Sequence, residues 1–130
     1  MGFVSVLLAA AASWIIGAVY YMVLSKPWVE AAGIAVDEKG RPAGQSATPF
    51  IMSFLAMLLV AGMMRHVFSM ADIDTVIKGI MAGGGIGLFM IAPWIMINNG
   101  YGMRPFKLTL IDGGYAVLGT VAMGIVLVLL

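Results

Sequence analysis

Four long apolar segments, separated by short polar stretches, constrain this chain more than any other feature. They cover residues 3–24, 47–64, 76–97 and 108–130. A helix needs about 20 mostly apolar residues to cross the hydrocarbon core of a bilayer. No segment alternates apolar and polar residues, as a strand of a membrane barrel must. The sequence therefore predicts an all-α fold, an integral membrane four-helix bundle with up-down topology, in one transmembrane domain over residues 1–130.

Composition makes the lipid bilayer the expected solvent. Hydrophobic residues make up 62% of the 130 residues and charged residues 10%, whereas a soluble domain carries about 25% charged residues. The formal net charge of +1 offers no basic face, so we expect no nucleic-acid partner. The chain has no cysteine, which excludes disulfides and thiolate metal sites. The first apolar run has no preceding Lys or Arg and exceeds a signal-peptide core, so a retained helix is expected.

The distribution of Lys and Arg predicts an orientation. One side of the membrane would hold five of these residues in the two loops that follow the first and third segments: Lys26, Lys39, Arg41, Arg104 and Lys107. The other side would hold two, Arg65 and Lys78. Because basic residues favour cytoplasmic loops, we expect both termini outside, in the inner (cytoplasmic) membrane of a bacterial cell.

Small residues recur at four-residue spacing in two segments and predict close helix packing. They are Ser13 and Gly17 in the first segment, and Gly79, Gly83 and Gly87, here called the glycine ladder, in the third. Each glycine costs about 1 kcal/mol against alanine in a helix in water, but in lipid this spacing lets another backbone approach. A four-helix bundle can use some of these faces internally, and any left over would suit a partner.

Local signals predict helix ends and an irregularity. Pro93 removes a backbone hydrogen bond one turn earlier, which predicts a kink near Leu88 and Phe89. Ser69, with Asp72 three residues later, predicts a capping box before the third membrane helix. In the first loop a proline in the first turn and a tryptophan predict a short helix along the membrane surface over residues 28–34.

Several short motifs carry a resemblance to a known family. They are Gly17-Ala18-Val19-Tyr20-Tyr21 followed by Lys26 and Trp28, then Ile91-Ala92-Pro93, and finally Arg104-Pro105-Phe106-Lys107 leading to Ile111-Asp112-Gly113-Gly114-Tyr115. Over nearly its whole length the chain resembles an uncharacterised family of small four-helix bacterial membrane proteins, a domain of unknown function. It departs from the family at Asp112, where asparagine is expected more often, and at Tyr20, where tryptophan is more usual. The resemblance implies a fold and a location but no activity.

A polar cluster is predicted at the cytoplasmic end of the bundle. A carboxylate costs about 2.5–3.5 kcal/mol at the centre of a membrane helix and usually has a role there, which makes Asp112 the strongest single candidate. The same leaflet is expected to hold Tyr20, Tyr21, Asn98, Asn99, Arg104 and Tyr115. Such a cluster could bind a small ligand or a lipid headgroup, or pass a proton. Alternatively, Asp112 caps a helix that begins at Gly113, where the helix dipole favours an anion.

Other candidate sites have simpler interpretations. His66 has methionines nearby but no second His or Cys, so no metal site is predicted. The glycine-rich run at residues 83–87 lacks the strand and the Lys-Ser/Thr pair of a phosphate-binding loop. The one histidine lies on the opposite side from Asp112, so no Ser–His–acid arrangement is available. We therefore expect no catalytic residue, no cofactor and no enzymatic activity.

Two functional classes follow from these patterns, with a third behind them. The first is an accessory or interaction subunit that associates through its glycine faces with itself, as a homo-oligomer, or with a larger membrane complex. The alternative is a small oligomeric transporter, channel or lipophilic-ligand-binding protein that uses the polar cluster around Asp112. A membrane enzyme acting on a lipid-soluble substrate is the third.

Overall fold

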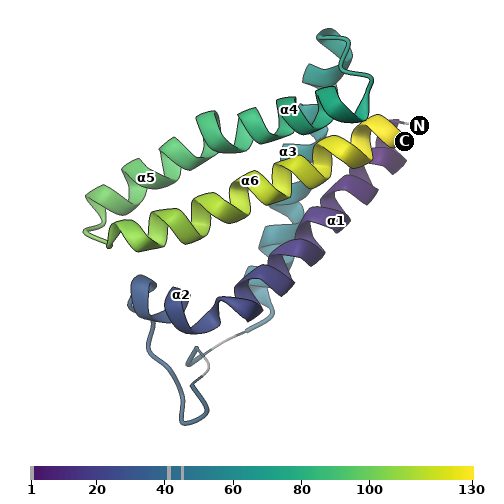
Figure 1. Cartoon of the computed structure of the whole chain (residues 1–130). Helices are drawn as coiled ribbons and strands as arrows, with labels where there is room; N and C mark the ends of the chain where they lie inside the picture. The colour runs from purple at the N-terminus through teal and green to yellow at the C-terminus, as the bar shows by residue number, and fades with distance from the viewer. Residues whose placement is uncertain (1, 41, 45) are drawn as a thin grey trace.

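The computed structural model describes residues 2–40, 42–44 and 46–130. Arg41, which contributes to the predicted orientation, lies outside the described residues, as does Met1, the first residue of the predicted retained helix. Four helical spans are long and apolar enough to cross a membrane: Gly2–Val23, Thr48–Met70, Val76–Tyr101 and Phe106–Leu129. The described residues form no strand beyond an isolated bridge between Val36 and Pro42. The prediction of an all-α, four-helix membrane fold is confirmed (Figure 1).

The inner pair of helices is α1 (Gly2–Val23) and α6 (Phe106–Leu129). In each of them 33% of the most apolar stretch is buried, against 11% in the other two spans. α6 packs against α1 and against the third span, which consists of α4 (Val76–Ile86), η1 (Gly87–Ile91) and α5 (Ala92–Tyr101). α3 (Thr48–Met70) packs mainly against α1. The two outer spans therefore present most of their apolar surface to lipid.

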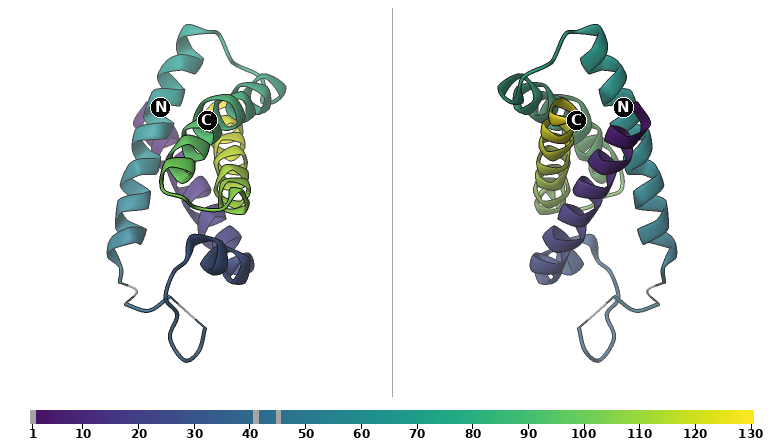
Figure 2. Two further views of the ribbon diagram at one scale, coloured as in Figure 1. Left: turned by 90° about the vertical axis from the view of Figure 1, so that its left-hand side faces the viewer. Right: turned by 90° about the vertical axis from the view of Figure 1, so that its right-hand side faces the viewer.

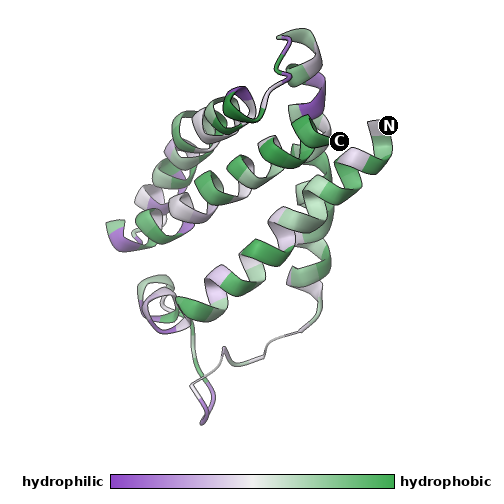
Figure 3. Cartoon of the chain, turned by 45° about the vertical axis from the view of Figure 1, so that its right-hand side comes forward, coloured by the Kyte–Doolittle hydropathy of each residue, from purple (hydrophilic) through white to green (hydrophobic). Residues whose placement is uncertain are grey.

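The two ends of the bundle differ in what they carry. Both termini and the α3–α4 loop lie at one end, and the long loop before α3 extends from the other (Figure 2). Apolar residues cover the spans along their length, whereas hydrophilic residues gather in the loops and at the helix ends (Figure 3). This distribution is that of a protein whose sides face lipid and whose ends face water.

The glycine ladder lies against α6. A methyl group added at Gly79 would lie 2.7 Å from the carbonyl oxygen of Gly124, and one added at Gly83 would lie 3.0 Å from the carbonyl carbon of Thr120. The third member, Gly87, meets α6 in the same way. The two backbones can approach this closely only because the ladder has no side chains. Contrary to the expectation of leftover faces, this one is occupied within the chain.

The third span is irregular where the proline predicts it. A π-helical turn, η1, lies between α4 and α5 and contains Leu88 and Phe89. Pro93 has no N–H to donate to the carbonyl one turn earlier. A π-helical turn is a common way for a helix to absorb such a break. The irregularity expected as a kink thus takes the form of a wider turn.

α3 ends six residues later than the predicted end at residue 64. The prediction stopped at Arg65 because a charge marks the edge of an apolar segment. The helix continues because Met64 and Phe68 prolong its buried face, at 2% and 5% exposure, while the Arg65 side chain is exposed. Charge marks the edge of the membrane, and a helix does not have to stop there.

The capping box predicted at Ser69 and Asp72 is wrong. Ser69 lies inside α3, and Asp72 is in the following turn with a φ of 55°. The N-cap of α4 is Thr75, whose Oγ1 accepts a hydrogen bond from the backbone N–H of Lys78 at 3.2 Å. The first two residues fit the pattern by spacing alone, and the helix uses the hydroxyl immediately before its first turn.

A short helix follows the first span, as expected for that region. α2 covers Ser25–Ala32 and ends at Gly33, whose φ of 69° suits a residue without a side chain. The guanidinium of Arg104, in the α5–α6 loop, donates a hydrogen bond to the carbonyl of Ala32. This contact ties the end of α2 to the loop before α6.

Candidate functional site

Four aromatic rings meet near the end of the bundle that carries α2. The ring centroids of Tyr20 and Tyr21 lie 5.3 Å apart, and those of Tyr115 lie 5.9 Å and 5.5 Å from them. Trp28 of α2 lies 5.6 Å from Tyr21. These are the separations of interacting aromatic pairs. We call these four residues, together with Asp112, the tyrosine cluster.

Glycines make room for the rings between α1 and α6. A methyl group added at Gly17 would lie 2.7 Å from the hydroxyl oxygen of Tyr115. One added at Gly119 would lie 2.7 Å from Oγ of Ser13. The small-residue face predicted at Ser13 and Gly17 is therefore covered by α6 and its tyrosine, within the chain.

Asp112 lies inside α6 and accepts a hydrogen bond from the hydroxyl of Tyr21 at 2.7 Å. The alternative that Asp112 caps a helix beginning at Gly113 is wrong, because α6 begins at Phe106, six residues earlier. At about 1.5 Å per residue the carboxylate lies about 9 Å into the helix. Its side chain is half-buried, and no described cation forms an ion pair with it.

The other two tyrosines donate to backbone carbonyls. The hydroxyl of Tyr20 donates to the carbonyl of Ile111 at 2.6 Å. The hydroxyl of Tyr115 donates to the carbonyl of Ser13 at 2.8 Å and lies 3.6 Å from the sulfur of Met57. These contacts join α1 to α6. Only the Tyr21 hydroxyl is committed to an ionisable side chain.

Three of the predicted cluster residues lie elsewhere. Asn99 donates through Nδ2 to Oγ1 of Thr109 at 3.2 Å, which ties α5 to α6. Asn98 is exposed, and Arg104 binds the end of α2. Of the seven residues predicted together, the structure joins Tyr20, Tyr21, Asp112 and Tyr115, and leaves out Asn98, Asn99 and Arg104.

Sequence reasoning missed Trp28 and Met57 as neighbours of the cluster. Trp28 was placed at the membrane interface, but the turn into α2 folds it back onto Tyr21. The basic-proline-tryptophan motif after the first segment was the available signal, since it predicts a helix start there. Met57 carried no signal, because its contact depends on how α3 leans on α1.

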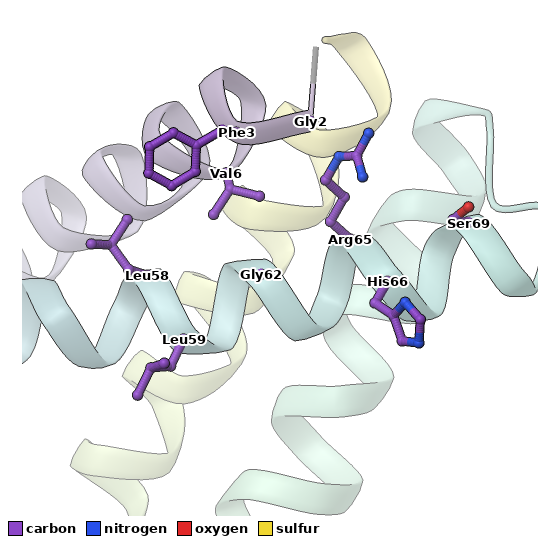
Figure 4. A pocket seen from close by; sticks show the side chains of 9 residues that line it. All are labelled: Gly2, Phe3, Val6, Leu58, Leu59, Gly62, Arg65, His66 and Ser69. Carbon is purple, nitrogen blue, oxygen red and sulfur yellow. The ribbon is translucent and has the colours of Figure 1, made fainter.

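A second depression lies at the opposite end, between the start of α1 and the second half of α3 (Figure 4). We call it the α1–α3 groove, and its volume is about 640 Å³. It is lined by Gly2, Phe3, Val6, Leu58, Leu59, Gly62, Arg65, His66 and Ser69. The groove is apolar along one part and polar at the other.

These features define a class: a small multi-pass helical membrane protein with an acidic, aromatic cluster near one end. The chain belongs to the family described as "Protein of unknown function (DUF1761)", which it matches over residues 4–128. The family resemblance inferred from the motifs is confirmed. No curated protein and no solved structure matches the chain. The function therefore has to be argued from the geometry of this molecule.

Proposed function

We propose that this protein binds a small organic cation at the tyrosine cluster, without catalysing a reaction. The observation that supports this most is the carboxylate of Asp112, held inside a membrane helix with a tyrosine hydroxyl and no described cation as partner. An ionised group in such a place is costly and marks a functional site by default. A cationic ligand would offset that cost, and the faces of aromatic rings attract organic cations.

The cluster is open enough to receive a ligand. Tyr20, Tyr21, Asp112, Tyr115 and Trp28 are each only partly buried. The rings come from three helices, so a small shift of α2 would change the width of the opening. The ligand class follows from the chemistry: one negative charge, three phenol rings and an indole.

A transporter is the form of this proposal that needs an oligomer. Four helices enclose little room, so a second copy would have to complete a path across the bilayer. The two outer spans have the free surface for such a contact, since only 11% of the most apolar stretch of each is buried. We therefore include a homo-oligomer in the proposal.

An accessory or interaction role is the second candidate. Its original support, the small-residue faces, is weakened because these faces are packed within the chain. What favours it is the outer face of α3, where Ile51, Leu55 and Leu59 are 60%, 55% and 78% exposed. This role requires no ligand at Asp112, so the experiment on cation binding separates the two candidates.

Cation binding is tested with the purified protein in lipid nanodiscs and tetraphenylphosphonium as the probe, by isothermal titration calorimetry. We expect Asp112→Asn to bind it at least about tenfold more weakly, because a charge-assisted contact of about 1.5–3 kcal/mol is lost. Asp74→Asn is the matched control, since this acid is 74% exposed at the other end. Equal binding by wild type and Asp112→Asn would exclude the cation site.

We propose, from the Lys and Arg distribution, that the tyrosine cluster faces the cytoplasm and both termini face outward in the inner membrane of a bacterial cell. Single cysteines test this because the chain has none. A membrane-impermeant maleimide applied to intact cells should label Met70→Cys and not Lys39→Cys. The reverse result would invert the orientation.

A further inference from the structure

The α1–α3 groove has walls of two kinds. Phe3 and Val6 of α1 face Leu58 and Leu59 of α3 across its apolar part (Figure 4). Gly62 lies between them and the polar part, and an added methyl group there would have no atom within 4 Å. The groove is therefore kept open at its middle by the absence of a side chain.

The polar part of the groove is cationic. Arg65, His66 and Ser69 follow Gly62 on the next turns of α3. None of these three side chains has a hydrogen-bond or ion-pair partner among the described residues. The nearby acid of the following loop, Asp74, is paired with Lys78 at 3.4 Å. The groove thus offers unpaired donors to an anion.

Arg65 reaches across the groove to α1. A methyl group added at Gly2 would lie 3.2 Å from the guanidinium carbon of Arg65 (Figure 4). The first turn of α1 contains no acidic residue, so nothing there neutralises the guanidinium. The cationic head of the groove is consequently shared by two helices, and a phosphate placed there would touch both.

The position along α3 says which anion fits. Thr48–Met70 carries no charged residue before Arg65, so this residue marks the level where the hydrocarbon core ends and headgroups begin. Leu58 lies seven residues before it, about 10 Å along the helix, on the hydrocarbon side. A molecule that spans the groove must have an anionic head at the boundary and an apolar chain below it.

We propose that the α1–α3 groove binds one anionic phospholipid. The phosphate lies on Arg65, His66 and Ser69, and an acyl chain lies against Phe3, Val6, Leu58 and Leu59. Basic pockets between membrane helices select anionic headgroups in this way. The site is separate from the tyrosine cluster, which lies at the other end of α1, so this proposal stands or falls without the cation proposal.

The test is native mass spectrometry of the purified protein, titrated with phosphatidylglycerol or phosphatidylcholine of the same chains. We expect wild type to retain phosphatidylglycerol in preference. Arg65→Gln should bind it about tenfold more weakly, because a charge-assisted hydrogen bond is lost. Gly62→Leu should also lose the lipid, because its side chain fills the middle of the groove, and cation binding at Asp112 should be unchanged in both variants.

Matched controls make the outcome decisive. Lys78→Gln removes the same charge at the same end outside the groove, and Gly85→Leu adds the same side chain on α4, where an added methyl group also has no atom within 4 Å. Both controls should retain the lipid as wild type does. Equal retention of the two lipids, or equal weakening by Lys78→Gln and Arg65→Gln, would overturn the proposal.

Two further outcomes are informative. Displacement of the lipid by glycerol phosphate at the lipid's own concentration would show that the acyl chain adds nothing, and would also overturn it. If Arg65→Gln fails to fold, as judged by circular dichroism and size exclusion, Gly62→Leu against Gly85→Leu decides alone. Loss of lipid in Gly62→Leu supports the groove, and normal retention refutes it.

Discussion

On one side, α6 meets the third span through the glycine ladder, with backbone against backbone at Gly79 and Gly83. On another side, the same helix meets α1 through side chains: Tyr115 donates to the carbonyl of Ser13, and Asp112 accepts from Tyr21. Both contacts run along much of the helix. Only the second places hydroxyl groups and a carboxylate between two membrane helices.

The difference shows what packing in this chain requires. The ladder holds two spans together with no polar side chain beyond the hydroxyl of Thr120, which is bonded to its own helix at Ala116. Side-chain hydrogen bonds between membrane helices contribute on average about 0.6 kcal/mol, less than the cost of a buried carboxylate. Packing therefore does not explain Asp112, and a ligand does.

The largest effect is expected on the ladder side. Gly83→Leu forces a side chain against the backbone at Thr120, which cannot move aside as a flexible side chain would. We expect a loss of about 3 kcal/mol in the free energy of unfolding, the upper part of the range for overpacking. The measurement is unfolding in mixed micelles followed by far-ultraviolet circular dichroism. Gly85→Leu is the control, and equal stability of the two variants would mean that the helices are not in backbone contact.

A smaller effect is expected from one hydrogen bond on the α1 side. Tyr115→Phe keeps the ring and removes the hydroxyl that donates to Ser13. The expected loss is about 0.6 kcal/mol, in the same unfolding measurement. Tyr101→Phe is the control, because Tyr101 is 88% exposed. A loss as large as that of Gly83→Leu would erase the contrast between the two contacts.

The spans were predictable because apolar length alone defines them, but their ends were not. Hydropathy reports where the membrane ends, and α3 continues past that point on the buried side of Met64 and Phe68. At α6 the error ran the other way. Pro105 immediately precedes the first helical residue, a position typical of a helix start. Giving that signal more weight would have placed Asp112 inside the helix.

The cluster was partly predictable for a geometric reason. Antiparallel spans bring their ends to the same membrane level, which correctly grouped Tyr20 and Tyr21 with Asp112 and Tyr115. Level does not fix the direction of a side chain around its helix axis. Asn99 therefore points to Thr109 instead, and that direction depends on tertiary packing that single-sequence patterns do not contain.

The smallest effect on stability is expected at the residue with the largest expected effect on binding. Asp112→Asn keeps the size of the side chain and an oxygen that accepts from Tyr21, and it removes a charge from a membrane helix. We expect the free energy of unfolding to change by less than about 0.5 kcal/mol, while tetraphenylphosphonium binding falls. Tyr21→Phe is the companion variant, since it keeps the charge and removes its donor. If Asp112→Asn instead destabilised the protein as much as Gly83→Leu does, the carboxylate would be a structural element of the α1–α6 contact, and the reason to assign it a ligand would be gone.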